Sequence, residues 1–182
     1  MGKKSKEKQE SKKILIMGLD DAGKTSLYLI LSKNANLLNY TKLRPTSGRE
    51  IYPPIVDGTD LYSIWDFGGQ LEFRKKYLES MDENLKDVDK IIYVIDIQAI
   101  QRYDESLTYL EAIVEAMNMR KIKVPISIFL HKFDKELEEK ADYKMDVLKE
   151  RLIDKISTLL ADFYFEIFKT TIYTLFNKVK LV

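Results

Sequence analysis

The stretch GLDDAGKT, residues 18–25, decides the fold that this sequence predicts. It matches the pattern G-x-x-x-x-G-K-[ST], in which a glycine-rich turn curls around phosphate oxygens. The apolar run KILIMG, residues 13–18, ends at the first glycine and predicts a buried parallel strand. Residues 24–38 are apolar on most sides and predict a helix that packs under other layers. A strand, a glycine-rich turn and a helix in this order are the context that a phosphate-binding loop requires.

Phosphate binding in such a loop depends on backbone groups more than on side chains. Successive N–H groups and the N-terminus of the following helix supply partial positive charge. Lys24 adds a full charge beside the β- and γ-phosphates, and the hydroxyl of Thr25 suits Mg²⁺. The phosphate-binding residues that we expect in this segment are Asp21, Ala22, Gly23, Lys24, Thr25 and Ser26.

Two adjacent carboxylates, Asp20 and Asp21, stand inside this loop although phosphate is itself an anion. They do not exclude phosphate binding, because side chains at the variable positions of the pattern are free to point away. Asp21 is expected to face solvent or a neighbouring loop. Asp20 lies where a side chain approaches the third phosphate, so its carboxylate would repel charge there unless it turns outward.

The rest of the chain alternates between short apolar runs and segments of helical periodicity. Further strands are predicted at residues 90–97, 125–130 and 163–169. Three more helices are predicted from apolar side chains at helical spacing. These side chains are Leu107, Leu110, Val114 and Met117 in the first, Leu148, Leu152, Ile156, Leu159 and Leu160 in the second, and Ile172, Leu175, Phe176 and Val179 in the last.

Residues 49–67 form two extended segments joined by Asp57-Gly58, which is a strong hairpin signal. Pro53 and Pro54 cannot donate hydrogen bonds, so the first segment is predicted to be an edge strand. Strands that alternate with helices predict a parallel sheet covered on both faces. The predicted fold class is therefore α/β, a P-loop NTPase fold with a six-stranded, mostly parallel sheet, one antiparallel edge strand and helices on both faces. In such sheets, ligands bind at the carboxyl ends of the strands.

The segment WDFGGQ, residues 65–70, follows the phosphate loop along the chain. Asp66 ends a predicted strand, where its carboxylate would hold a water molecule of the Mg²⁺ shell. The N–H group of Gly69 would donate to the γ-phosphate, and the amide of Gln70 would orient an attacking water molecule. The alternative interpretation is a strand end followed by a flexible turn.

The segment RPTSG, residues 44–48, precedes the hairpin. A threonine in a mobile loop reaches Mg²⁺ and the γ-phosphate only when that phosphate is present. Thr46 is our choice for this role, with Ser47 as the second candidate. Arg44 is either a solvated side chain or an arginine that acts in cis on the developing charge.

The segment HKFD, residues 131–134, directly follows the strand predicted at 125–130. The two oxygens of Asp134 would accept the paired N–H groups on one edge of guanine and so select it over adenine. The methylene stem of Lys132 would lie over the purine face, and His131 would brace the loop. A surface charge pair is the alternative.

Together these segments resemble the Ras-like small GTPases, and the Arf and Rag branches more closely than Ras or Rab. GLDDAGKT, WDFGGQ and RPTSG are similar to the Arf motifs, whereas HKFD and FKTTIY, residues 168–173, are similar to the Rag loops that read guanine. The resemblance implies that Thr171 and Ile172 contact the guanine carbonyl and brace the base loop. It covers residues 12–182, and we expect a divergent, single-domain member.

The resemblance implies a molecular switch that binds GTP or GDP with Mg²⁺ and hydrolyses GTP. Gln70 and Lys24 are the expected catalytic residues, and Thr25, Thr46 and Asp66 (through water) the expected metal site. Hydrolysis is expected to be slow without an activating protein, with Asp20 as one cause. The alternatives are a GTP-dependent scaffold that does not hydrolyse, and a P-loop ATPase. Expected partners are activating and effector proteins, with roadblock or longin-type proteins as candidates.

Composition limits the remaining classes. The chain has 182 residues, a net charge of +1 and no cysteine, which excludes a disulfide framework, thiolate metal sites and a cysteine nucleophile. The balanced charge gives no general attraction to nucleic acid. Residues 1–11 are predicted to be a flexible, lysine-rich arm, and residues 12–182 the GTPase domain. We expect a cytoplasmic protein whose contact with a membrane surface is at most weak and made by the arm lysines.

Overall fold

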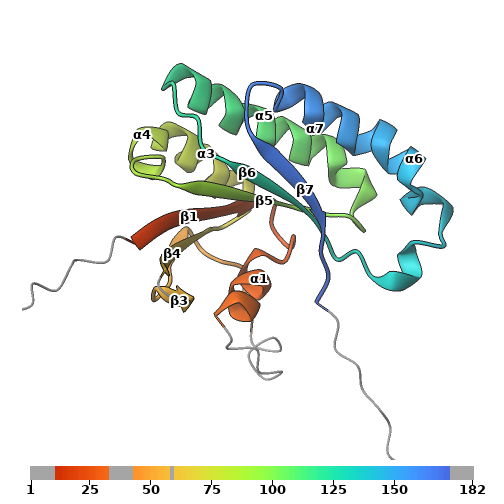
Figure 1. The fold of residues 1–182 in the computed structure, drawn as a ribbon, viewed down its shortest axis with the longest axis horizontal. Helices are drawn as coiled ribbons and strands as arrows, with labels where there is room; N and C mark the ends of the chain where they lie inside the picture. Colours follow the sequence, from red (N-terminus) through yellow and green to blue (C-terminus); the bar gives the residue numbers. More distant parts are fainter. Residues whose placement is uncertain (1–10, 33–42, 58–59, 173–182) are drawn as a thin grey trace, which may run out of the picture.

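The computed structural model describes residues 11–32, 43–57 and 60–172, and places seven strands in one sheet (Figure 1). The sheet order is β2-β4-β1-β5-β6-β7, and β3 pairs with β4 beside β2. All pairs from β4 to β7 are parallel. The strands are β1 (Ser11–Gly18), β2 (Arg49–Ile51), β3 (Ile55–Asp57), β4 (Asp60–Phe67), β5 (Lys90–Asp96), β6 (Ile126–His131) and β7 (Phe165–Lys169).

The predicted antiparallel edge is present, divided into two short strands. β2 and β3 both pair antiparallel with β4, and Pro53 and Pro54 lie between them. A proline lacks the N–H group that a ladder needs, so the pairing stops there and resumes at Ile55. The predicted α/β class and the edge position of this segment are confirmed.

Helices cover both faces of the sheet (Figure 1). α1 (Lys24–Leu31) lies on one face, and α3 (Leu71–Glu79), α4 (Met81–Asn84) and α5 (Tyr103–Met119) lie on the other, together with α6 (Met145–Leu148) and α7 (Asp154–Leu159). The helix predicted around residues 148–160 runs through α6, a π-helical turn η4 (Lys149–Ile153) and α7. The helix predicted from Ile172 onward, the end of the one predicted at 24–38, and most of the N-terminal arm lie outside the described residues. Within those residues, no helix is both long and apolar enough to cross a membrane.

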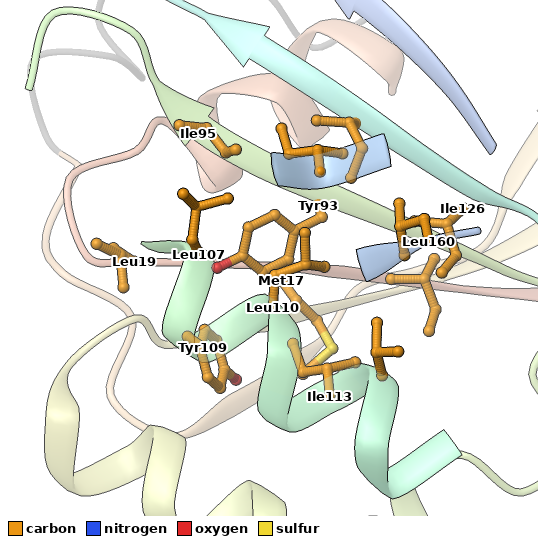
Figure 2. Packing of buried hydrophobic residues seen from close by; sticks show 14 of the residues in the cluster. Met17, Leu19, Tyr93, Ile95, Leu107, Tyr109, Leu110, Ile113, Ile126 and Leu160 are labelled. Carbon is orange, nitrogen blue, oxygen red and sulfur yellow. The ribbon is translucent and has the colours of Figure 1, made fainter. Parts of the chain in front are cut away.

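Strand periodicity divides the core into two halves. In β5, Ile91, Tyr93 and Ile95 belong to the larger cluster, whereas Ile92 and Val94 belong to the cluster beneath α1. Both faces of a central parallel strand are buried, so the residues between Lys90 and Asp96 are hydrophobic, and successive residues point to opposite sides. Figure 2 shows Tyr93 in the larger cluster, where its hydroxyl donates to the carbonyl of Ser106 at 2.7 Å.

The sheet order places a crevice above the phosphate loop. From β1 the chain continues to β2 and β4 on one side, and it later returns to place β5, β6 and β7 on the other. The connections after β1 and β5 therefore leave in opposite directions, which creates a gap at the carboxyl ends of these strands. The segments after β1, β4, β5, β6 and β7 all reach this end of the sheet.

Candidate functional site

The phosphate loop is held by glycines where the backbone leaves no room for a side chain. Gly18 has φ +141°, and a β-carbon there would lie 2.3 Å from the carbonyl oxygen of Val94 in β5. Gly23 has φ +86° and stands immediately before α1, where no described side chain caps the helix. The first N–H groups of α1 thus point into the loop without a side-chain acceptor, as a phosphate site requires.

Lys24 is the first residue of α1 and is almost completely buried, with 6% of its surface exposed. Its Nζ donates to the carbonyl of Leu19 at 2.6 Å, which holds the ammonium group across the loop. Burial lowers the pKa of Lys24 to about 8, although the charges of Asp66, Asp20 and Asp21 oppose this shift. The site therefore contains a poorly solvated cation that an anionic ligand would stabilise.

Three predicted metal-site residues meet at one point. The hydroxyl of Thr25 donates to Oδ2 of Asp66 at 2.5 Å, and the hydroxyl of Thr46 donates to the same atom at 3.2 Å. The two hydroxyl oxygens lie 3.0 Å apart. Asp66 is fully buried, and its Oδ1 has no hydrogen-bond partner among the described residues. A buried carboxylate with one unsatisfied oxygen beside two hydroxyls is an all-oxygen donor set, which suits Mg²⁺.

Tyr52 contacts this cluster, which the sequence did not predict. Its hydroxyl lies 3.4 Å from Oδ2 of Asp66 and 3.2 Å from Oε2 of Glu50, and its single proton can be donated to either carboxylate. Its ring stacks on Tyr28 of α1 with centroids 3.6 Å apart. Burial and the two carboxylates raise the pKa of Tyr52, so the phenol keeps its proton and acts as a donor. Tyr52 thereby links the antiparallel edge to Asp66, one of the predicted metal-site residues.

The turn after β4 lies against the segment before β2 on one side and against the phosphate loop on the other. A β-carbon on Gly68 would lie 2.3 Å from the carbonyl oxygen of Thr46, and the N–H of Gly68 donates to the carbonyl of Gly48 at 3.0 Å. On the other side, a β-carbon on Gly69 would lie 1.9 Å from the backbone nitrogen of Asp20. Gln70 follows directly and is half-buried. The two glycines thus allow three backbone segments to meet.

A cavity of about 250 Å³ opens between these loops. It brings together the phosphate loop, the segment before β2 and the turn after β4, which the sequence places far apart. Its lining residues are Asp20, Asp21, Gly23, Lys24, Thr25, Ser26, Leu43, Arg44, Pro45, Thr46, Gly69, Gln70 and Lys132. Ser47, the second candidate for the role of Thr46, is not among them.

The loops after β6 and β7 are joined beside this cavity. His131 is 1% exposed, and its Nδ1 lies 2.9 Å from the hydroxyl of Thr170. Burial lowers the pKa of His131 to about 4, so its ring is neutral. A β-carbon on Gly23 would lie 2.6 Å from Cδ2 of His131, so the ring lies directly against the phosphate loop. His131 therefore contacts both the loop after β7, through Thr170, and the phosphate loop, at Gly23.

Asp134 is held in place by its neighbours. The hydroxyl of Thr171 donates to one carboxylate oxygen, and Nε2 of Gln98 donates to the other at 2.9 Å. Lys132 has φ +59°, and its Nζ pairs with Asp96 at 2.7 Å. The structure thus brings Asp134 and Thr171 into contact, while Ile172, the next residue, is half-buried. Gln98, which fixes the carboxylate, was not predicted.

A sequence model described as "Gtr1/RagA G protein conserved region" matches residues 13–178. The chain belongs to the Arf- and Rag-like small GTPases. Members of this family bind and hydrolyse GTP. The chain is 35% identical over 129 residues to ADP-ribosylation factor-like protein 3 of Chlamydomonas reinhardtii, covering 71% of this chain and 67% of that protein. It is 28% identical to Ras-related GTP-binding protein A of Dictyostelium discoideum, over 72% of this chain and 44% of that protein.

Solved structures agree on the fold of this small GTPase. A Trypanosoma brucei Arl6 small GTPase with bound GppNp superposes with a TM-score of 0.68 at 20% identity, over 89% of this chain and 87% of that one. The mammalian SRP receptor superposes with a TM-score of 0.63 at 16% identity, over 88% and 91% of the two chains. The expected Arf- and Rag-like resemblance and the small G-protein fold are confirmed.

Asp20 of the GTPase turns its carboxylate onto an arginine that no motif marked. Nη2 of Arg102 donates to Oδ1 of Asp20 at 2.7 Å, and Nη1 donates to its backbone carbonyl at 3.3 Å. Nε of Arg102 donates to Glu105 at 2.9 Å, and Glu105 also pairs with Arg74 of α3. The carboxylate of Asp20 thus points toward Arg102, which is the outward orientation that the sequence left open.

Three residues of the site thus escaped sequence reasoning, namely Tyr52, Gln98 and Arg102. Each of the three lies far along the chain from the motif residue that it contacts, so no local sequence pattern marks it. A weak signal existed for Gln98 and Arg102, because both follow a predicted buried strand at the carboxyl edge where the ligand is expected.

Proposed function

We propose that this GTPase is a molecular switch that binds GTP and GDP with Mg²⁺ and hydrolyses GTP slowly when no activating protein is present. The convergence of Thr25, Thr46 and Asp66 carries the proposal. Thr25 comes from the phosphate loop, Thr46 from the segment before β2 and Asp66 from β4, and the three side chains share one oxygen-lined point. A ligand bound there would connect the phosphate loop to a segment able to move.

Thr25 and Thr46 would hold Mg²⁺ directly, and Asp66 would hold it through a water molecule. The ion supplies positive charge to the β- and γ-phosphate oxygens. The unsatisfied Oδ1 of Asp66 supports this assignment, since a buried carboxylate oxygen is rarely left without a partner. The other oxygen of the same carboxylate, Oδ2, accepts the hydrogen bond of the Thr25 hydroxyl.

The hydrolytic step would use two side chains of the cavity wall. Gln70 would orient a water molecule toward the γ-phosphate through its amide, and Lys24 would neutralise charge that develops on the phosphate oxygens. Both residues line the cavity. An arginine supplied by an activating protein would add roughly 10³–10⁵-fold in rate, so slow unassisted turnover is expected.

The switch would consist of residues 42–50 and 68–80. Thr46 and the N–H of Gly69 would respond to the γ-phosphate, whose loss releases both segments. The contact of Gly68 with Thr46 and Gly48 supports this coupling. The Trypanosoma brucei neighbour was solved with the nucleotide analogue GppNp, which supports a triphosphate ligand at the corresponding place.

Guanine selection would depend on Asp134. Its carboxylate oxygens would accept the two N–H groups of guanine, with Thr171 and Gln98 fixing their direction. Competition between GTP and ATP for the protein tests this choice and the ATPase alternative together. Asp134→Ala should weaken GDP binding at least tenfold, because the two N–H groups of guanine would lose their charged acceptors. Unchanged GDP affinity would remove the base assignment.

Multiple-turnover release of phosphate from GTP tests the proposed reaction. Gln70→Ala should lower the rate while leaving GTP-analogue affinity within about twofold, because the amide acts on water rather than on the nucleotide. Binding without any turnover, with or without candidate activating proteins, would instead favour the non-hydrolysing scaffold.

Arg44 is a second candidate for a catalytic arginine. It lines the cavity two residues before Thr46, and it is exposed. A guanidinium acting in cis would make the unassisted rate fall in Arg44→Ala, whereas a solvated arginine would leave that rate unchanged. Measuring phosphate release from this variant separates the two.

Effector proteins would read the surface of α3, although most of its apolar side chains are packed inward. Tyr77 is buried, and Phe73 and Leu78 pack against the core. Leu71 is 58% exposed at the start of the helix, next to Gln70. A roadblock or longin-type partner remains our candidate, to be tested by pull-down with GDP- and GppNp-loaded protein.

A further inference from the structure

Asp20 and Arg102 meet because of the strand order. Asp20 lies in the loop after β1, and Arg102 ends the 3₁₀ helix η1 (Ile100–Arg102) after β5. β1 and β5 are neighbours at the point where the connections diverge. One guanidinium thereby binds both the carboxylate and the backbone carbonyl of a single phosphate-loop residue.

The guanidinium of Arg102 is itself held on its other side. Its Nε donates to Oε2 of Glu105, and Oε1 of Glu105 pairs with Arg74, which is 6% exposed. Two arginines and two carboxylates therefore alternate from the phosphate loop to α3. Because each guanidinium is a rigid fork, Arg102 has one orientation that satisfies both of its carboxylate partners.

Asp20 would otherwise face the ligand. It lines the cavity together with Lys24, Gly69 and Gln70. Its backbone nitrogen lies directly against Gly69, the residue proposed to donate to the γ-phosphate. A carboxylate freed from Arg102 would be attracted into the cavity by Lys24, and it would then stand at the γ-phosphate end.

The carboxyl group of Asp20 is charged at neutral pH. Partial burial raises its pKa, but the hydrogen bond and the charge of Arg102 outweigh this effect and leave the pKa below its ordinary value. The group therefore retains a negative charge that only its position keeps away from phosphate.

We propose that Arg102 is a positioning residue that holds the Asp20 carboxylate out of the γ-phosphate position and so allows the loop to accept a triphosphate. The inference rests on the proposed function, since it concerns how the same site distinguishes GTP from GDP. A merely structural ion pair would affect the binding of both nucleotides equally. A positioning role affects mainly the nucleotide that has the third phosphate.

The experiment measures the affinities of GDP and GppNp for the wild type, Arg102→Ala, Asp20→Asn and the double variant. In Arg102→Ala, the GppNp affinity should fall roughly tenfold relative to that of GDP, because an unpaired carboxylate faces phosphate in a poorly screened site. Removing that charge as well should restore the ratio, so the double variant should return to within about twofold of the wild type. Asp20→Asn alone should leave the ratio within a similar range.

The matched control is Arg120→Ala. Arg120 also pairs with an aspartate, Asp82, but it follows the far end of α5 and does not line the cavity. Its loss should leave the nucleotide ratio unchanged. Thermal unfolding of every variant checks the fold, and Arg102→Lys, which keeps the charge without the fork, should give a ratio between those of the wild type and Arg102→Ala.

The outcomes separate the two proposals. A wild type that binds neither nucleotide would overturn the proposed function and this inference with it. A wild type that binds both GDP and GppNp would leave the proposed function intact. In that case, the positioning role alone would be overturned by an unchanged ratio of GppNp to GDP affinity in folded Arg102→Ala. A double variant whose ratio stays as low as that of Arg102→Ala would overturn it too. If Arg102→Ala does not fold, a wild-type ratio in Arg102→Lys would overturn it too.

Discussion

Gly69 and Asp20 are in backbone contact, so close that a β-carbon on Gly69 would lie 1.9 Å from the nitrogen of Asp20. The turn after β4 thus lies directly on the phosphate loop. Because this contact involves two backbones, neither partner can yield as a flexible side chain would. The spacing between the two segments is consequently set by the absence of one methyl group.

Gly69→Ala should separate these segments and misplace both the Gly69 N–H and Gln70. A displacement of this size costs on the order of 10²-fold in rate when it moves a catalytic group, so phosphate release should fall by about that factor. Met119→Ala is the control, because Met119 is 80% exposed at the end of α5 and does not line the cavity. Equal rates for Gly69→Ala and the control would contradict the proposed arrangement.

Asp66→Asn should make nucleotide binding much less dependent on Mg²⁺. The change keeps the shape of the side chain but removes the charge from the metal-site cluster, and loss of such an outer partner costs about 10–100-fold in metal affinity. The measurement is the release of fluorescent GDP across a Mg²⁺ titration. Asp60→Asn, an exposed carboxylate at the start of the same strand, should behave like the wild type.

From the lowered pKa of Lys24, we expect a loss of GTP affinity at alkaline pH. Burial lowers its pKa to about 8 in the nucleotide-free protein, so the side chain is charged below pH 8 and loses its proton above it. Because phosphate favours the charged form, affinity should fall as pH rises beyond 8, by up to about tenfold per pH unit. Lys24→Arg keeps its positive charge over the whole pH range, so any fall in GTP affinity in this variant comes from titration of the nucleotide. If GTP affinity fell equally in the wild type and in Lys24→Arg, the prediction would be contradicted.

From the lowered pKa of His131, we expect the folded protein to lose stability in mild acid. Its pKa is about 4 in the folded protein because burial disfavours the charged ring, whereas the unfolded value is near 6.5. The unfolded chain therefore binds the proton first, and stability should fall as pH drops from 6.5 to 4, by roughly 2–3 kcal/mol from this group. His131 is the single histidine of the chain, so its ring resonances report the titration directly. A midpoint above pH 6 would refute the prediction.

Replacing His131 by asparagine tests the same effect by chemical denaturation. The difference in unfolding free energy between pH 7 and pH 4.5 should be smaller in His131→Asn than in the wild type, because asparagine does not titrate. An identical difference in both proteins would assign the acid sensitivity to the carboxylates instead.

The strands were predictable because burial on both faces leaves a simple signature. The predicted strand at 90–97 corresponds to β5, Lys90–Asp96, and every residue between its ends is buried. The helix marked by Leu107, Leu110, Val114 and Met117 is α5, which buries all four. The π-helical turn η4 was not predictable, because Leu148, Leu152 and Ile156 keep an ordinary helical spacing across it.

The motif residues were chosen from short spacings in the sequence, whereas the side chains that contact them carry no such pattern. Thr25 and Asp66 belong to patterns whose chemistry dictates the residue type. Arg102, by contrast, is an ordinary arginine in the sequence and acquires its partner only because β5 lies beside β1. Tyr52 likewise reaches Asp66 only through the pairing of the edge with β4.

Gly68 joins the two segments that we propose as the switch. Its N–H is bonded to Gly48 and its α-carbon faces Thr46, so the segment before β2 and the turn after β4 share one junction. If a partner protein displaced either segment, this shared junction would move the other segment as well. We therefore expect partners that contact either segment to respond to one common change of state rather than to two independent ones.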